Sequence, residues 1–275
     1  MDHQDELFSS AFRILTAAIA QRAFPAASVA ITRAGKLVAL KSFGRFVYDT
    51  DMGAPLLAAL ARSGDSHIPN LTPATLFDLA SLTKVVATTT MAMILYERGL
   101  LELDAPLVGT VPEFRTPSDL RRENVTFRML LAHSSGLPAY EKLFLKARTR
   151  DELLHAAFTM PLSAAPGTRA EYSDIGFIIL GAALERIAEE SLAVFCQREI
   201  FGPLAMTRTT FNPPGEIRAQ IPPTADERED QCGAGAAARE TPAPPMPPGA
   251  SPSARSTFRN RIIQGEVQDE NAYVL

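Results

Sequence analysis

The stretch that decides the fold is Phe77-Asp-Leu-Ala-Ser-Leu-Thr-Lys84, which places a serine and a lysine three residues apart where an apolar helical pattern begins. That pattern predicts a helix from about residue 81 to residue 98, ending at Gly99, where a left-handed cap residue belongs. Residues three apart share a helix face, so the Ser81 hydroxyl and the Lys84 amine are expected within mutual reach. Such a pair suits a nucleophile and its base. Taken alone the pattern is weak, because serine commonly caps helices and a lysine one turn later is usually only solvated.

The surroundings of Lys84 are expected to favour its neutral form. The positive end of the helix dipole and the apolar side chains of Leu79, Leu82 and Val85 all disfavour an ammonium ion. The sequence therefore predicts that the pKa of Lys84 is lowered toward neutrality, which frees the amine to accept the Ser81 proton. The backbone N–H of Ser81 is a candidate for one half of an oxyanion hole.

A second candidate segment is Tyr172-Ser-Asp174, which follows the turn at Pro166-Gly167 and opens a predicted helix. The Tyr172 phenol is the right group to relay a proton to a leaving group beside the serine and lysine. The alternative is that Tyr172 is a half-buried aromatic residue and that Asp174 merely caps its helix.

A histidine beside serines, in His133-Ser-Ser-Gly-Leu-Pro138, invites comparison with a catalytic triad. No Gly-x-Ser-x-Gly elbow or suitably placed acid accompanies it, which argues against a triad.

Together these segments resemble the serine β-lactamase and penicillin-binding-protein family. Residues 77–104 resemble the active-site helix of class C-type β-lactamases, related esterases and D-alanyl-D-alanine carboxypeptidases, and residues 133–138 resemble a structural His-Thr-Ser-Gly-Leu loop of that family. Residues 172–174 resemble its Tyr-x-Asn motif, with Asp174 in place of the amide, and a carboxylate cannot donate a hydrogen bond to substrate. The resemblance covers residues 5–230.

The resemblance implies a serine hydrolase that works through an acyl-enzyme. Ser81 is then the nucleophile, Lys84 the base with Tyr172 sharing the proton path, and Asp174 a substrate-binding residue. The implied substrate is a small molecule or peptidoglycan-like: a β-lactam, a D-Ala-D-Ala peptide or an ester. No metal and no organic cofactor is implied.

One family element is missing from the sequence, namely the Lys-Thr-Gly or His-Thr-Gly triplet of a late edge strand. The resemblance therefore predicts a chain truncated at its C-terminus, without the final strands of the sheet. Three alternatives stay open: an active hydrolase completed by a part outside this chain, an impaired remnant that only binds ligand, or a product with no stable function.

The expected fold class is α+β of the β-lactamase/transpeptidase-like type, a helical region packed on an antiparallel sheet. A first helix over residues 5–22 precedes a hairpin that turns at Arg33-Ala-Gly-Lys36, and further helices are predicted at 126–133, 151–158, 174–190 and 191–201. Residues 1–230 are expected to form the incomplete family domain, residues 231–256 a disordered Pro/Ala/Gly-rich insert, and residues 257–275 a residual segment.

Composition excludes several other classes. With 275 residues, 46% of them hydrophobic, the chain can bury a sizeable core, and its 27 basic and 31 acidic residues form no basic block that would bind nucleic acid. The acidic amino terminus is unlike a secretory signal, and no apolar run reaches the roughly 20 residues of a membrane span, so a soluble cytoplasmic protein is expected from the sequence as written. The two cysteines, Cys196 and Cys232, fit neither a disulfide scaffold nor a zinc site.

Overall fold

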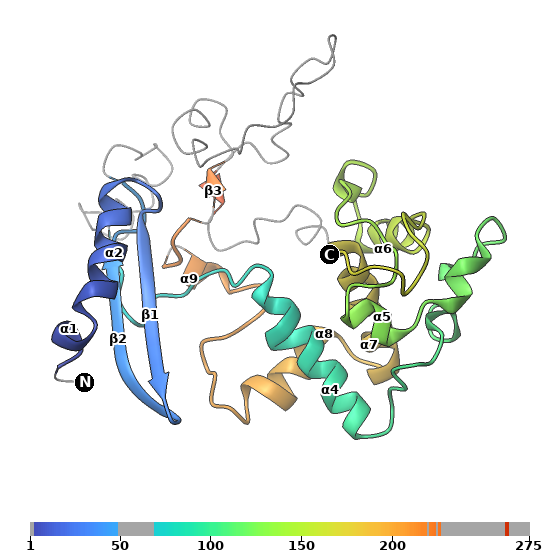
Figure 1. Cartoon of the computed structure of the whole chain (residues 1–275), viewed down its shortest axis with the longest axis horizontal. Coiled ribbons are helices and arrows are strands. Elements are labelled where there is room, and N and C mark those ends of the chain that lie inside the picture. The colour runs from blue at the N-terminus through green and yellow to red at the C-terminus, as the bar shows by residue number, and fades with distance from the viewer. Residues whose placement is uncertain (1–2, 49–68, 219, 224, 227–261, 264–275) are drawn as a thin grey trace, which may run out of the picture. The chain divides into compact units, whose positions relative to one another are not determined.

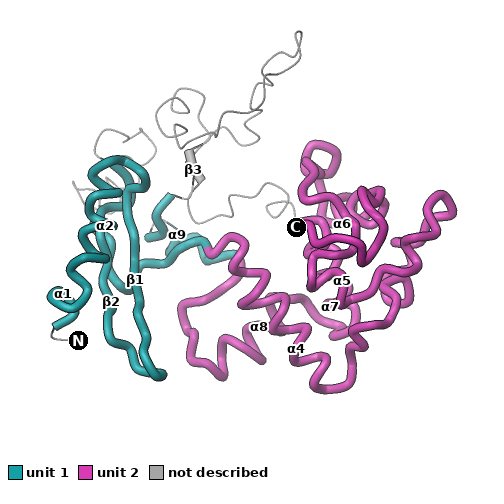
Figure 2. The backbone as a smooth tube through the Cα atoms, viewed as in Figure 1, with its two compact units in different colours: residues 1–78, 212–267 teal, residues 79–211, 268–275 magenta. Residues whose placement is uncertain are grey.

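The computed structural model describes residues 3–48, 69–218, 220–223, 225–226 and 262–263, and its fold is α+β, as predicted (Figure 1). The chain divides into two compact units (Figure 2): unit 1 comprises Met1–Asp78 with Asn212–Val267, and unit 2 comprises Leu79–Phe211 with Gln268–Leu275. The predicted insert at residues 231–256 lies outside the described residues, as does most of the segment 257–275.

Unit 1 is built around the predicted hairpin. Strands β1 (Ala26–Arg33) and β2 (Lys36–Gly44) pair antiparallel, with Arg33 opposite Lys36 at the turn. The two turn residues, Ala34 and Gly35, both have positive φ angles, 49° and 74°. Two-residue turns of this kind match the right-handed twist of the strands that they join, which explains why the chain reverses here.

The first helix is present but divided. It consists of α1 (Gln4–Leu7) and α2 (Ser9–Ala20), separated at Phe8, and α2 lies along the hairpin (Figure 1). Phe12 on α2 is buried, and its ring centre lies 5.3 Å from that of Phe43 on β2. This aromatic contact supplies the core between helix and hairpin.

The remaining elements of unit 1 are short. Helix α9 spans Gly215–Arg218, and strands β3 (Ala225–Asp226) and β4 (Ile262–Ile263) form a separate antiparallel pair. In the part of the chain that the structure describes, each of the two sheets therefore has two strands.

Unit 2 is helical in its described residues. Its α-helices are α4 (Thr90–Glu97), α5 (Phe127–Leu131), α6 (Arg150–Phe158), α7 (Asp174–Ala188) and α8 (Leu192–Cys196). Its 3₁₀ turns are η3 (Leu107–Gly109), η4 (Pro112–Phe114), η5 (Leu120–Asn124) and η6 (Leu143–Leu145). Two π-helical segments, η2 (Lys84–Thr89) and η7 (Gln197–Phe201), lead into α4 and extend α8. The helices predicted from the sequence are all present within a few residues.

Helix α7 forms the centre of unit 2. It packs against α4, α5, α6 and α8, and its apolar side chains on more than one face are buried. The apolar stretch from Ile175 to Leu184 explains this position, because a helix that is hydrophobic nearly all round is stable only where neighbours cover it. The consequence for the site is that the N-terminus of α7, with Asp174, is held by the core of the unit.

Candidate active site

The Ser81–Lys84 segment of unit 2 folds as a tight helical start. Backbone hydrogen bonds of three-residue spacing run from Thr83 N to Ala80 O and from Lys84 N to Ser81 O, at 3.0 and 3.1 Å. This turn brings the two side chains onto one face, and Lys84 Nζ donates a hydrogen bond to Ser81 Oγ over 3.1 Å. The proximity expected from the spacing is therefore present.

Two further features mark the backbone around Ser81. Ala80 has a φ of 44°, a left-handed conformation that is uncommon for a residue with a Cβ and that is often found beside functional groups. Among the residues that the structure describes, no backbone carbonyl accepts a hydrogen bond from the Ser81 N–H. Ser81 as a whole is exposed.

Asp174 is the close partner of Lys84. Its Oδ1 lies 2.6 Å from Lys84 Nζ, and the two side chains are only 24% and 18% exposed. The interpretation of Asp174 as the cap of its helix is wrong, because Ser173 is the N-cap residue: its Oγ accepts a hydrogen bond from Gly176 N at 2.9 Å. Asp174 is thus free to form the ion pair.

This ion pair reverses the expected protonation of Lys84. Burial is the largest single influence and disfavours the ammonium, but hydrogen bonds to Asp174 and Tyr172 and their charges together outweigh it and raise the pKa of Lys84 above 10.5. The prediction of a lowered pKa is therefore wrong. Leu82 and Val85, expected to desolvate the amine, have exposed side chains, whereas the carboxylate that stabilises the ammonium comes from α7.

Tyr172 lies beside the same ammonium. Lys84 Nζ is 5.2 Å from the centre of the Tyr172 ring, and Tyr172 is 51% exposed. All four residues singled out in the sequence, Ser81, Lys84, Tyr172 and Asp174, therefore meet in one cluster of unit 2.

Two residues of this cluster were not assigned to it from the sequence. The His133 ring centre lies 4.6 Å from that of Tyr172 and 4.9 Å from that of Phe177, and Lys84 Nζ lies 5.9 Å from the Phe177 ring centre. The position of Phe177, one turn after Asp174 on α7, was the available signal, since residues three apart share a face.

His133 is held as a neutral imidazole. Its Nδ1 accepts a hydrogen bond from the Ser173 N–H at 3.0 Å, so this nitrogen carries no proton. Burial and the charge of Lys84 lower the pKa of His133, and the charge of Asp174 only partly opposes them. This arrangement agrees with the structural role expected for the loop of residues 133–138.

That loop holds the segment that presents Tyr172. Backbone hydrogen bonds join Gly167 N to Ser134 O at 2.7 Å, Glu171 N to His133 O at 2.8 Å and Asp174 N to Ala139 O at 2.8 Å. At its centre Gly136 has a φ of 82° and approaches Ala164 so closely that an added Cβ would lie 2.3 Å from the Ala164 carbonyl oxygen. Glycine is thus required here by both conformation and space.

Replacing Gly136 by alanine is expected to lower the free energy of unfolding by about 2 kcal/mol or more, because the loop must shift away from Ala164. Gly99→Ala is the matched control: Gly99 also has a positive φ, 69°, but an added Cβ meets nothing within 4 Å. Urea unfolding of both variants measures the difference. Equal losses in the two variants would mean that the close contact at Ala164 has no energetic weight.

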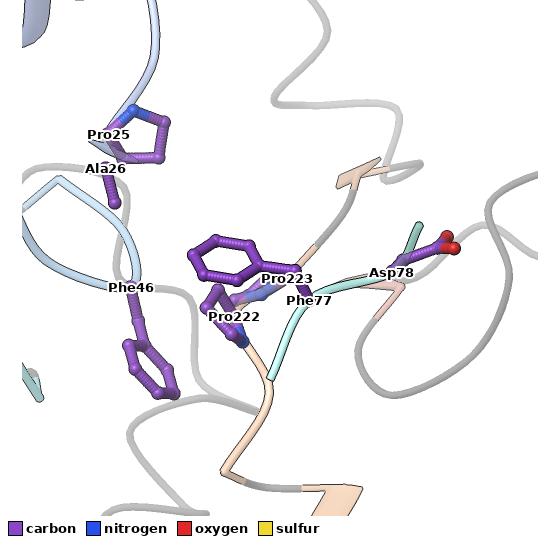
Figure 3. Close-up of a pocket in the computed structure, with 7 residues that line it drawn as sticks. All are labelled: Pro25, Ala26, Phe46, Phe77, Asp78, Pro222 and Pro223. Atoms are coloured by element: carbon purple, nitrogen blue, oxygen red, sulfur yellow. The ribbon is translucent and has the colours of Figure 1, made fainter. Parts of the chain in front are cut away.

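The surface hollows do not coincide with this cluster. A crevice of about 150 Å³ lies in unit 1. Figure 3 shows the residues that line it, among them the rings of Phe46, Phe77, Pro222 and Pro223, with Asp78 at its side. A second, more open hollow in unit 2 involves Val194 and Phe211. Neither is lined by Ser81, Lys84, Tyr172 or Asp174.

Other types of site find little support. Within the described ranges, no group of three or more His, Cys, Asp or Glu side chains is placed to bind a metal ion. Burial raises the pKa of the Cys196 thiol to about 12, so this cysteine is unreactive; Cys232 lies outside the described residues. No helix among the described residues is both long and apolar enough to span a membrane.

Comparison with known proteins places the chain in a family. The family model described as Beta-lactamase matches residues 11–253. A putative D-alanyl-D-alanine carboxypeptidase of Escherichia coli (strain K12) is 33% identical over 152 residues, covering 52% of this chain and 35% of the relative. Esterase EstB of Burkholderia gladioli is 34% identical over 207 residues, covering 65% of this chain and 52% of the relative.

A solved class C beta-lactamase has the same fold, with a TM-score of 0.66 over 83% of this chain and 57% of that one, at 19% identity. The chain spans about half the length, or less, of the curated relatives that it matches. Members of the matched family are hydrolases. Since the family model matches most of its length, this chain belongs to the beta-lactamase family.

Proposed function

We propose that this protein is a serine hydrolase that forms an acyl-enzyme at Ser81. The observation that carries the proposal is the hydrogen bond of 3.1 Å between Lys84 Nζ and the exposed Ser81 Oγ, with Tyr172 beside the same amine. A serine hydroxyl is a weak nucleophile by itself, and it needs a neighbouring group that takes its proton. The contact of Lys84 with the Ser81 hydroxyl, and the position of Tyr172 beside Lys84, support this role for the pair.

The proposed reaction has two steps. Ser81 Oγ attacks the carbonyl carbon of the substrate while its proton passes to the deprotonated Lys84 amine, with Tyr172 in the proton path. The bond to the leaving group then breaks as that group receives a proton from the same path. Water hydrolyses the resulting ester of Ser81 and regenerates the hydroxyl. The Ser81 N–H, which is not used by a described carbonyl, is the candidate donor to the developing oxyanion.

The proposed substrates are those of the family, namely a β-lactam, a D-Ala-D-Ala peptide or a simple ester. The names of the relatives, a carboxypeptidase and an esterase, support the peptide and the ester.

A second candidate function is ligand binding with little or no turnover. It is favoured by the ion pair of Lys84 with Asp174, because an ammonium cannot take a proton from Ser81.

Covalent labelling tests the proposal. Incubation with a fluorophosphonate, and separately with a fluorescent penicillin, is expected to add the mass of the bound reagent to the peptide that contains Ser81. Hydrolysis of nitrocefin, a D-Ala-D-Ala peptide and p-nitrophenyl butyrate then separates turnover from simple acylation. A label that maps to another serine, or no label with either reagent, would contradict the assignment of Ser81.

A further inference from the structure

We propose that Asp174 is a positioning residue that gates the site: its ion pair with Lys84 holds the amine as an ammonium, so that Ser81 reacts slowly at neutral pH and faster in alkaline solution. This inference rests on the proposed function at Ser81. It gives Asp174 a role toward Lys84, in place of the substrate contact that its position in the Tyr-x-Asn-like motif implies.

The geometry of the pair supports this gate. Lys84 Nζ lies between two oxygens, 3.1 Å from Ser81 Oγ and 2.6 Å from Asp174 Oδ1. Asp174 Oδ1 is shielded from solvent, and both side chains are largely buried. A carboxylate in such a position stabilises a neighbouring ammonium more than water does, because the surrounding dielectric is lower.

The other groups around Lys84 do not supply a negative charge in place of the Asp174 carboxylate. Tyr172 and Phe177 present ring faces to the ammonium at 5.2 and 5.9 Å, and both favour its charged form. His133 is neutral, with Nδ1 bonded to the Ser173 N–H. Among the described residues, Asp174 is the only carboxylate within ion-pair distance of Lys84.

The proton balance follows from these contacts. Lys84 first loses a proton to hydroxide or a buffer base and becomes a neutral amine. Its lone pair then accepts the Ser81 proton as the bond from Oγ to the carbonyl carbon forms. Because Asp174 raises the pKa of Lys84, the first loss is rare at neutral pH, and the rate of acylation is expected to rise with pH.

Asp174→Asn isolates the charge, since the amide oxygen can still accept a hydrogen bond from Lys84 while the negative charge is removed. We expect fluorophosphonate labelling of Ser81 at pH 7.5 to become about tenfold faster or more, and the rising limb of the pH profile between pH 6 and 10 to move to lower pH. Asp104→Asn is the matched control. Asp104 is also ion-paired, with Arg128 at 2.7 Å, but its side chain is 74% exposed, so this variant should keep the wild-type profile.

A second measurement determines the protonation state of Lys84 independently of any reaction at Ser81. The rate of acetylation of Lys84 by acetic anhydride, followed by mass spectrometry against pH, reports the fraction of neutral amine. It should begin at lower pH in Asp174→Asn than in the wild type. Asp174→Ser, which removes the charge through a different side chain, is expected to shift in the same direction and serves if the asparagine variant does not fold, as judged by circular dichroism.

The outcomes separate the two proposals. If Ser81 is never labelled in any variant, the proposed function fails, while Lys84 acetylation still decides whether Asp174 holds the ammonium. If Ser81 is labelled but Asp174→Asn has the wild-type pH profile, or becomes slower at every pH, the gate is overturned and the proposed function stands.

Discussion

Replacing Ser81 by alanine is expected to reduce any hydrolase activity by at least about 10³-fold, because it removes the oxygen that forms the acyl bond. The fold should be kept, since Ser81 is exposed and its side-chain hydrogen bond is with Lys84 at 3.1 Å. Substitutions at such positions usually change the free energy of unfolding by no more than about 0.5 kcal/mol. Rates of p-nitrophenyl butyrate and nitrocefin hydrolysis, together with the melting temperature, measure the two effects separately.

Ser118→Ala is the control for this variant. Ser118 is an exposed serine of the same unit, whose hydroxyl lies 2.8 Å from the Thr116 hydroxyl. It should retain wild-type rates and wild-type labelling. Unchanged turnover in Ser81→Ala would show that the activity resides elsewhere and would remove the basis of the proposed function.

Replacing Arg122 by alanine is expected to lower the free energy of unfolding by about 3 kcal/mol or more. Arg122 is 1% exposed, and its guanidinium donates hydrogen bonds to the carbonyls of Phe114, Phe158 and Met160. It also lies 3.9 Å from the centre of the Phe114 ring. The alanine leaves three carbonyls without their donor and a cavity where the side chain was, and both effects destabilise the folded state.

Arg121→Ala is the matched control, one residue away. Arg121 is exposed and pairs with Asp119 at 2.6 Å, a surface ion pair that typically contributes about 1 kcal/mol or less. Urea unfolding should therefore show that Arg122→Ala loses several-fold more free energy of unfolding than Arg121→Ala. If Arg122→Ala does not accumulate as a folded protein while Arg121→Ala does, this also shows that the buried guanidinium stabilises the fold. Equal losses of stability in the two variants would contradict that role.

The elements of this fold could be predicted because their signals are local. Gly99, with a φ of 69°, ends the helix that follows Ser81, as predicted, and the turn at Ala34-Gly35 reverses the hairpin. The break at Phe8 between α1 and α2 was not predicted, and neither was the π-helical segment at Lys84–Thr89. A one-residue interruption hardly changes an apolar periodicity, so the sequence pattern gives no warning of it.

The burial of Arg122 could not be predicted from the sequence. In the stretch Asp119-Leu-Arg-Arg-Glu123 the two arginines are neighbours with the same chemistry, yet Arg121 is exposed and Arg122 is almost fully buried. The difference arises because Arg122 meets the carbonyls of Phe114, Phe158 and Met160, two of them on a segment more than 30 residues away in the chain. Only packing between distant segments decides which of the two is inside.

In the candidate site, too, some contacts follow from the local sequence and others only from packing between distant segments. The sequence by itself determined that Ser81 and Lys84 meet, because residues three apart on a helical turn share a face whatever surrounds them. It also carried the family resemblance that singled out Tyr172. Only the tertiary structure decided that Asp174 pairs with Lys84 across 90 residues of chain and that His133 stacks on Tyr172. The protonation of Lys84 depends on this distant carboxylate, because a pKa is the sum of burial and of every nearby charge, and neither can be read from the turn that holds the lysine.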